Sequence, residues 1–260
     1  MGEEKDDIRI RECTTVEEYD ACVRLQREAF GLPDLELSPR RHLIVVRSAG
    51  GFTLGAFDGG QMVGYVLNQL AACRDRETGA EETCGYSHMM AVAKDYQNRG
   101  VGARLKWAQR ARVIADGRRL IRWTWDPMQS RNAHFNLNRL GVVVRSYAEN
   151  YYGTDYSTVT GRFAEPLGLD SDRLVAEWEL DSPRVEALAR GETPEHRGGP
   201  EASVAIPPNG SALVREDPAS ARAELLRVRA AFQAAFTAGL VCAGFERDQT
   251  APRYLFYSDK

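Results

Sequence analysis

The stretch VAKDYQNRGVGA, residues Val92–Ala103, decides the fold, because it joins an apolar strand to a basic helix through a turn with two glycines. The apolar run His88–Ala93 predicts the strand, and the helix is expected from Gly100 to about Asp116. The first N–H groups of a helix have no partner within the helix, and the helix dipole adds partial positive charge there. Glycine lets a phosphate approach these N–H groups closely. The segment therefore predicts a seat for a phosphate or pyrophosphate.

Two common phosphate-binding loops do not fit this turn. A P-loop needs a Lys-Ser or Lys-Thr pair after its last glycine, whereas Ala103 and Arg104 follow Gly102. A dinucleotide-binding fingerprint needs a third glycine, and the residues after Gly102 leave no place for one. The pattern that does fit is Gln/Arg-x-x-Gly-x-Gly/Ala, which occupies Gln97–Gly102.

The predicted secondary structure gives the turn its context. The expected elements are a strand at Ile8–Cys13, a helix capped by Thr14 or Thr15, a hairpin of Phe52–Phe57 and Met62–Leu70, a strand at Tyr86–Ala93, the helix after the turn, a strand at Leu120–Trp125, a helix at Ser130–Leu140, and strands at Val142–Tyr147 and Leu174–Leu180. A charged loop is expected at Ala72–Glu82, and residues 33–50 give no clear pattern. The order is β-α-β-β-β-α-β-α-β-β.

The hexapeptide Gln97–Gly102 resembles the acyl-CoA signature of the GCN5-related N-acetyltransferase (GNAT) superfamily. The element order over residues 8–182 matches the core of that family, apart from a helix often found before the hairpin. The resemblance implies an α/β (α+β) fold with a mixed, mostly antiparallel sheet flanked by helices. It also implies an acyl-CoA-dependent N-acyltransferase, with acetyl-CoA as the default donor and a small-molecule amine as the acceptor. We assign residues 1–182 to this acyl-CoA-binding catalytic domain.

Residues 183–260 form a C-terminal extension to that domain. Gly191–Gly210 has the Pro, Gly and charge content of a linker or loop, within which Val204–Ile206 is a candidate short strand. Asp217 and Pro218 are typical of a helix start, and a closing hairpin is expected at Leu240–Phe245 and Arg253–Tyr257. This helix and hairpin resemble the end of a GNAT core, so a partial second copy and a generic extension covering a sheet edge both stay open.

Composition restricts the function classes. The net charge of −3 gives no support to nucleic-acid or polybasic membrane binding. The segment from Gln97 to Arg122 contains eight Lys or Arg residues and a single acidic residue. This charge balance indicates a solvated basic surface, which would also suit a polyanionic cofactor. The five cysteines have no zinc-like spacing, so we expect reduced thiols and no metal. Residues 1–7 do not resemble a signal peptide, and we expect a cytoplasmic protein, with a homodimer left open.

The resemblance also assigns the contacts with acyl-CoA. The pantetheine arm would pair with the backbone of the strand before the turn, and the turn would hold the pyrophosphate mainly through N–H groups. Two asparagines one helical turn apart are further candidates for contacts with the pantetheine or acyl group. The cofactor-binding residues are thus Met90, Ala91, Val92, Gln97, Asn98, Arg99, Gly100, Val101, Gly102, Ala103, Asn132 and Asn136.

Catalysis requires a base for the amine, donors for the oxyanion and an acid for the leaving thiolate. Many family members use as this acid a tyrosine four residues before the glycine that ends the helix after the fifth strand. Counting back from Gly141 gives Leu137, so that tyrosine is missing. The catalytic candidates are therefore His88, Tyr147 and Glu149, with Tyr151, Tyr152, His134 and, least favoured, Cys84 as further options. Proton transfer through water to a distant carboxylate is a further alternative.

Two segments bear on the alternatives. Residues 125–141 and 172–180 look like a little-characterised branch of predicted acyltransferases, some of which are associated with N-acylation of amino acids, N-succinylation included. A succinyl-CoA-type N-acyltransferase of amino acids is therefore the second enzyme hypothesis. The missing tyrosine motivates a non-catalytic acyl-CoA-binding or sensing module. A purely structural protein is disfavoured, because it leaves the phosphate turn unexplained.

Overall fold

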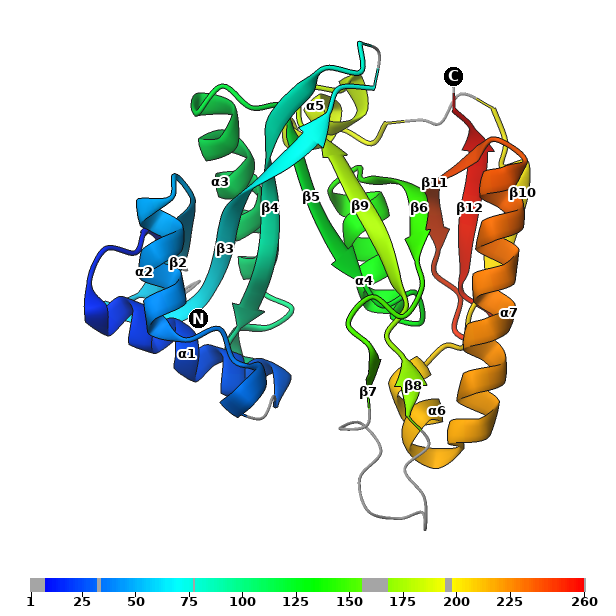
Figure 1. Cartoon of the computed structure of the whole chain (residues 1–260), viewed down its shortest axis with the longest axis horizontal. Coiled ribbons are helices and arrows are strands. Elements are labelled where there is room, and N and C mark those ends of the chain that lie inside the picture. Colours follow the sequence, from blue (N-terminus) through cyan, green and yellow to red (C-terminus); the bar gives the residue numbers. More distant parts are fainter. Residues whose placement is uncertain (1–7, 32–33, 77, 156–167, 195–197, 260) are drawn as a thin grey trace, which may run out of the picture. The chain divides into compact units, whose positions relative to one another are not determined.

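The chain divides into two compact units, which we call unit 1 (Met1–Arg122) and unit 2 (Trp123–Lys260). The computed structural model describes residues 8–31, 34–76, 78–155, 168–194 and 198–259 (Figure 1). Residues 1–7, where no signal peptide is predicted, lie outside the described residues. The unit boundary falls inside strand β5 (Leu120–Trp125). The proposed end of the catalytic domain at residue 182 stays a prediction.

Unit 1 contains the elements up to the first half of β5. They are β1 (Arg9–Glu12), α1 (Val16–Phe30), a 3₁₀ turn η1 (Asp34–Glu36), α2 (Arg40–Ser48), β2 (Phe52–Asp58), β3 (Gln61–Arg74), β4 (Glu81–Val92), a second 3₁₀ turn η2 (Lys94–Tyr96) and α3 (Val101–Ala115). Strands β1 to β4 form an antiparallel series in chain order, and the start of β5 lies parallel to β4 through Gly85↔Ile121 and Tyr86↔Arg122.

Helices cover both faces of this sheet. Tyr19 and Leu25 of α1 and Leu43 of α2 pack with Tyr65 and Ala91 in one buried apolar cluster. The other face belongs to α3, because a Cβ added at Gly64 of β3 would meet Leu105 and Val101 of that helix. We name these the α1/α2 face and the α3 face. Helix α2 is the element missing from the predicted order, and it lies within the segment 33–50, which shows no clear pattern in the sequence.

The start of α1 follows directly from its sequence. Thr15 accepts a hydrogen bond from the Glu18 N–H, and the Glu18 carboxylate accepts from the N–H of Thr15, so both halves of a capping box are present. The two acids of the first turn, Glu17 and Glu18, also complement the helix dipole. Of the two threonines that the sequence offered, Thr15 is the cap.

Unit 2 contains the remaining elements. They are α4 (Ser130–Ala133), a π-helical segment η3 (His134–Arg139), β6 (Val143–Ala148), β7 (Thr154–Asp155), β8 (Leu169–Asp170), β9 (Arg173–Glu179), α5 (Pro183–Ala189), β10 (Ala202–Ala205), α6 (Gly210–Glu216), α7 (Pro218–Thr237), β11 (Leu240–Glu246) and β12 (Arg253–Ser258). Its sheet has the order β5-β9-β6-β11-β12-β10, and β7 and β8 form a separate pair.

Helix α7 packs along the strands that follow it in the chain, as Figure 1 shows. Phe232 is fully buried, and its ring lies 5.0 Å from the rings of both Tyr254 and Phe256 on β12. Strand β11 pairs with β6 through Cys242↔Val144, so the extension after residue 182 continues the sheet of unit 2. The predicted helix after Asp217 and the predicted hairpin are both confirmed.

The structure corrects two predicted elements. The helix expected at Ser130–Leu140 is α-helical only to Ala133, and η3 then continues it with wider turns. The charged loop expected at Ala72–Glu82 is shorter, because β3 and β4 pair out to Arg74↔Glu81. The short strand expected at Val204–Ile206 is present as β10, which begins two residues earlier and pairs its Val204 with Tyr254.

Candidate active site

The turn after β4 has the geometry of an anion-binding site at a helix N-terminus. Gly100 is the N-cap of α3 with φ +79°, a left-handed conformation that favours glycine. No side chain of the described residues caps this helix. The first intrahelical bond runs from Arg104 N to Gly100 O, so the N–H groups of Val101, Gly102 and Ala103 lie ahead of it.

The surroundings hold this turn in place and leave space at its glycines. Gln97 donates its side-chain N–H to Val92 O at 3.1 Å, and Tyr96 donates its hydroxyl to Asp58 at 2.7 Å. A Cβ added at Gly100 would meet nothing within 4 Å, and one at Gly102 would make only ordinary contacts. The turn therefore has the backbone N–H groups and the space that an anion such as a phosphate needs.

The predicted basic face next to the turn is only partly solvated. Asn98, with φ +63°, and Arg99 are exposed at the turn, and the Arg99 guanidinium lies 5.2 Å from the Tyr96 ring centre. Arg112 forms an ion pair with Glu12 at 2.7 Å. Lys106 departs most from the prediction, since it is buried on the α3 face. The positive charge available near the turn is therefore smaller than the eight Lys and Arg residues of this segment would suggest.

A β-bulge places His88 beside helix α2. Strand β3 pairs Leu67 with Met89 and Asn68 with Ser87, so His88 is the extra residue of β4. Ser87 faces α3, whereas both His88 and Met89 contact residues on the α1/α2 face. In a regular strand consecutive side chains point to opposite faces, and a β-bulge is the irregularity that lets His88 and Met89 share one face.

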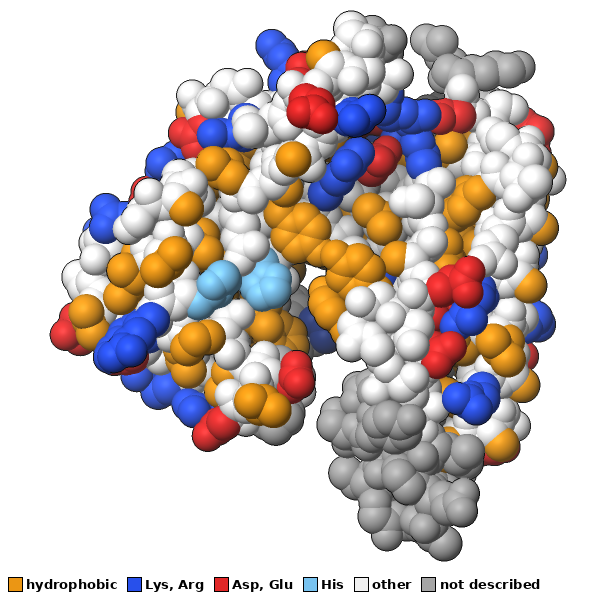
Figure 2. All heavy atoms as spheres, in the orientation of Figure 1, with side chains coloured by type: hydrophobic (Ala, Val, Ile, Leu, Met, Phe, Trp, Pro, Cys, Tyr) orange, Lys and Arg blue, Asp and Glu red, His pale blue; other side chains and the backbone are white. Residues whose placement is uncertain are grey.

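His88 belongs to a small cluster of polar side chains. Its Nε2 lies 3.2 Å from Ser38 Oγ, and its ring stands edge-on to that of His42 with centres 6.0 Å apart. Gln69 Nε2 lies 2.7 Å from His42 Nε2, which makes the imidazole nitrogen the acceptor, because an amide nitrogen only donates. Figure 2 shows two histidine side chains next to each other on the displayed face. We call His88, His42, Ser38 and Gln69 the histidine cluster.

Gln26 fixes the loop that carries Ser38. The side chain of Gln26 is fully buried, accepts from the Ser38 N–H at 2.8 Å and donates to the Ser38 carbonyl at 3.1 Å. Sequence reasoning missed Gln26, Ser38, His42 and Gln69. No periodicity marks them, and they meet only because the bulge turns His88 toward α2.

Burial lowers the pKa of His88 below its usual value, and the neighbouring His42 lowers it further. His88 is therefore neutral near pH 7, the form that accepts a proton. Its half-buried position on β4 gives it access to a ligand. Cys84 on the same strand is different, because burial raises the pKa of its thiol to about 12, which leaves too little thiolate for a nucleophile.

The strand residues predicted to contact the cofactor lie between the bulge and the turn. Met90, Ala91 and Val92 pair with Val66, Tyr65 and Gly64 of β3. Alternate residues of a strand direct their N–H and C=O groups to opposite edges, so β4 also presents backbone groups on the edge away from β3. Met90 and Val92 face α3, since both would contact a Cβ at Gly102.

Tyr147 and Glu149 lie in unit 2, within a network around Arg229. Tyr147 donates its hydroxyl to Asp172 at 2.6 Å, and Arg229 pairs with the same carboxylate at 2.7 Å. Burial and this hydrogen bond raise the pKa of Tyr147. Glu149 forms an ion pair with Arg229 at 3.3 Å. Both side chains thus have structural partners, and their catalytic roles stay predictions.

The two asparagines assigned to the cofactor have different surroundings. Asn132 is exposed on α4, whereas Asn136 is 4% exposed within η3. A π-turn holds more residues than an α-turn, so the α-helical spacing used for the prediction does not describe this segment. Leu137, at the position of the family's tyrosine, is completely buried and serves packing. Cofactor contacts of Asn132 and Asn136 stay predictions.

The element order and the glycine turn define an acetyltransferase-type α/β protein. The sequence model of the Acetyltransferase (GNAT) family matches residues 16–136. Residues 16–136 therefore belong to a GNAT-type acetyltransferase domain, as the resemblance of the turn predicted. No curated protein matches the sequence.

Solved structures share this fold at low sequence identity. The ribosomal-protein-S18-alanine N-acetyltransferase from Escherichia coli is 13% identical with a TM-score of 0.50, over 66% of this chain and 94% of that one. An N-acetyltransferase from Staphylococcus aureus is 12% identical with a TM-score of 0.50, over 67% and 99%. A GNAT family acetyltransferase from Elizabethkingia anophelis with acetyl-CoA bound is 17% identical with a TM-score of 0.47, over 67% and 99%. The predicted mixed fold is confirmed.

The family and the fold together support acyl-CoA-dependent acetyltransfer to an amine as the general activity. Among the described residues, no helix combines the length and apolar character needed to cross a membrane. The same part of the chain holds no group of three or more His, Cys, Asp or Glu side chains suited to a metal ion.

Proposed function

We propose that the protein transfers an acyl group from an acyl-CoA, with acetyl-CoA as the default donor, to the amine of a small molecule. The observation that carries this proposal is that the phosphate turn and the bulged His88 lie at the two ends of one short stretch of β4. His88 and Val92 are four positions apart, which is about 13 Å of strand. A thioester held by its phosphates at the turn would therefore lie along β4 toward His88.

In this proposal the side chains of unit 1 have separate roles. The N–H groups of Val101, Gly102 and Ala103 bind the pyrophosphate, and Met90 and Val92 offer backbone groups to the arm. His88 accepts the proton of the attacking amine, because its neutral form predominates near pH 7. Ser38 orients the imidazole through its hydroxyl, and Gln26 holds Ser38.

Two alternatives keep specific support. A succinyl-CoA-type transfer to an amino acid rests on the resemblance of residues 125–141 and 172–180 to members associated with N-succinylation. A non-catalytic acyl-CoA sensor is favoured by Leu137, a buried apolar residue where many family members carry the tyrosine that protonates the thiolate.

Calorimetric titration with CoA, acetyl-CoA and succinyl-CoA tests the cofactor, and the preferred thioester identifies the donor. The decisive variant is Gly102→Glu, because this position has no positive φ and a Cβ fits there without a clash. A carboxylate at the helix N-terminus repels phosphate, so we expect CoA affinity to fall at least tenfold. The neutral Gly102→Gln variant controls for size. Equal affinity of the two folded variants would refute the phosphate seat.

Turnover distinguishes enzyme from sensor. We expect thiol release from acetyl-CoA or succinyl-CoA in the presence of a panel of amines and amino acids. Tight binding of a thioester without release across that panel would favour the sensor.

A further inference from the structure

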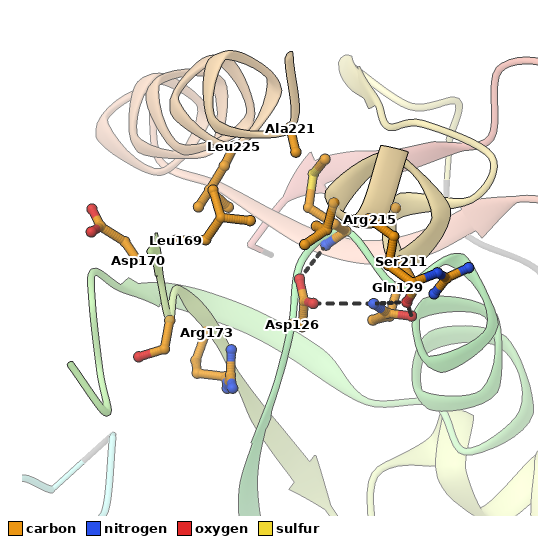
Figure 3. A pocket seen from close by; sticks show the side chains of 13 residues that line it. Asp126, Gln129, Leu169, Asp170, Arg173, Ser211, Arg215, Ala221 and Leu225 are labelled. Carbon is orange, nitrogen blue, oxygen red and sulfur yellow. Dashed lines mark hydrogen bonds between the residues drawn. The ribbon is translucent and has the colours of Figure 1, made fainter. Parts of the chain in front are cut away.

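Unit 2 contains a cavity of about 330 Å³, which we call the unit-2 pocket (Figure 3). Its volume lies at the small end of the range for ligand sites, so it suits a compact molecule. None of the residues that line it belongs to the phosphate turn or the histidine cluster.

The pocket has an apolar wall and a charged wall. Leu225 and Ala221 of α7 face into it, together with Leu169 and Met128. Figure 3 shows Asp126 and Arg173 opposite α7, with Ser211 and Arg215 of α6 on the other side of Asp126 from Arg173. Asp126 follows the end of β5, whereas Arg173 begins β9. Three chain segments more than 30 residues apart thus supply charges to one cavity.

Hydrogen bonds orient the carboxylate of Asp126, but no positively charged side chain pairs with it in the described part of the chain. It accepts from Met128 N–H at 2.8 Å and from Gln129 Nε2 at 3.1 Å, and Gln129 also donates to Ser211 at 3.0 Å. No cation of the described residues forms an ion pair with Asp126. The other acid of the lining, Asp170, differs because Arg229 pairs with it at 2.8 Å.

The two arginines that line the pocket also have no carboxylate partner within the described part of the chain. Arg173 donates to the carbonyl of Asp172 and lies 5.1 Å from the Tyr152 ring centre. Across the described part of the chain, neither Arg173 nor Arg215 takes part in an ion pair. Charges of both signs that share a half-buried cavity without pairing gain most from a ligand that supplies both partners.

The floor of the pocket is rigid before any ligand binds. Tyr254 donates its hydroxyl to Pro127 O at 2.8 Å and accepts from Trp125 Nε1 at 3.3 Å, which fixes the segment that carries Asp126. Helix α6 approaches this segment so closely that a Cβ on Gly210 would lie 2.7 Å from Met128 O. A preorganised site loses little free energy to ordering when it binds a ligand.

We propose that the unit-2 pocket binds a small zwitterion with an apolar body, the chemistry of an apolar α-amino acid. Its ammonium group pairs with Asp126, and its carboxylate pairs with Arg173, the arginine on the same side of Asp126 as Leu169. Leu225, Ala221 and Leu169 contact the apolar side chain. The proposal does not depend on acyl transfer, because the binding can be measured without CoA.

The test is calorimetric titration of the full chain, without CoA, with L-leucine, L-methionine and L-phenylalanine. For whichever binds, the amide lacks the carboxylate and the N-acetyl derivative lacks the ammonium group. We expect one-to-one binding of at least one amino acid and a loss of at least tenfold for both derivatives. No binding of the three, or equal binding of an amino acid and its two derivatives, would overturn the proposal.

Variants locate the site. Asp126→Asn keeps an acceptor for the Met128 N–H, and we expect it to weaken the amino acid at least tenfold while leaving the N-acetyl derivative unchanged. Arg173→Gln should weaken the amino acid and leave the amide unchanged. Glu192→Gln and Arg190→Gln are exposed controls outside the pocket. Unchanged affinity in folded Asp126→Asn would place the ligand elsewhere. If a variant unfolds, the affinities of the wild type for the amide and for the N-acetyl derivative still test the proposal.

Discussion

His88 connects local backbone geometry to the proposed chemistry. An imidazole accepts a proton only in its neutral form, and burial together with His42 lowers the pKa of His88. We therefore expect kcat/KM of the wild type to rise with pH through an apparent pKa below the usual histidine value of about 6.5. His42→Gln removes the neighbouring imidazole that contributes to this shift, so the apparent pKa should move upward.

The matching loss-of-function variant is His88→Gln. Loss of a general base typically lowers the rate about 10²- to 10⁴-fold, so kcat should fall by that order while the Kd of acetyl-CoA stays unchanged. A wild-type pH profile in His88→Gln would remove His88 from the mechanism, and an unshifted profile in His42→Gln would remove the histidine pair.

Lys106 is a buried amine on the opposite face of β4. Its Nζ donates to Ser87 Oγ at 2.7 Å, and burial lowers the pKa of Lys106 well below its usual value. Between this lowered pKa and about 10.4, the unfolded chain holds a proton that the folded chain has lost, so stability rises with pH. Lys106→Met should remove this dependence.

We therefore expect Lys106→Met to be more stable than the wild type at pH 7, by about 1 kcal/mol or more, with the difference shrinking toward pH 10. Urea denaturation across that range measures it. Lys94→Met, at an exposed position, is the control and should show no such trend. A constant difference between the Lys106 variant and the wild type would mean that the amine stays charged when buried.

At the scale of elements, Gln26 ties α1 to the loop before α2. Replacing Gln26 with leucine keeps the volume but leaves the N–H and C=O of Ser38 without their partners, which should cost about 2 kcal/mol of stability. Because that loop carries Ser38 to His88, kcat should fall while the Kd of acetyl-CoA stays constant. Arg24→Gln, exposed on the same helix, is the control. An unchanged kcat in folded Gln26→Leu would limit Gln26 to a structural role.

Elements with strong local signals were predictable from the sequence. Strand β5 has the predicted bounds, because alternating apolar residues end at Asp126-Pro127. Helix α7 begins at Pro218, where Asp217 caps it as expected. Helix α2 gave no such signal, since it buries only Leu43 and Val46.

Features that depend on pairing between strands were not predictable. The bulge at His88 exists only in the register of β3 against β4, and nothing in the sequence of β4 alone marks it. The predicted turn could be located because its glycines, Gly100 and Gly102, lie close together in sequence. The histidine cluster could not, because Ser38, His42, Gln69 and His88 come from separate elements.

At the scale of the whole molecule, the two proposed ligand sites draw on different parts of the chain. The phosphate turn and the histidine cluster come from unit 1, whereas the unit-2 pocket combines the end of β5 with β9, α6 and α7. Its charged residues lie far apart in sequence, at positions 126, 173 and 215, so no sequence motif predicts the pocket. The extension after residue 182 therefore supplies ligand-binding residues as well as strands.

Hydrogen exchange can map both sites in one protein. A ligand at 100 times its Kd stabilises the native state by about 2.7 kcal/mol, which slows exchange most where the ligand contacts the backbone. Acetyl-CoA should protect the amides of Val101–Ala103, Met90 and Val92, because these N–H groups are the proposed donors. The amino acid selected by calorimetry should instead protect the Asp126–Gln129 turn and α6. In Gly102→Glu the first pattern should vanish and the second persist. Protection of the turn by the amino acid, or loss of both patterns in this variant, would show that the two sites are not separate.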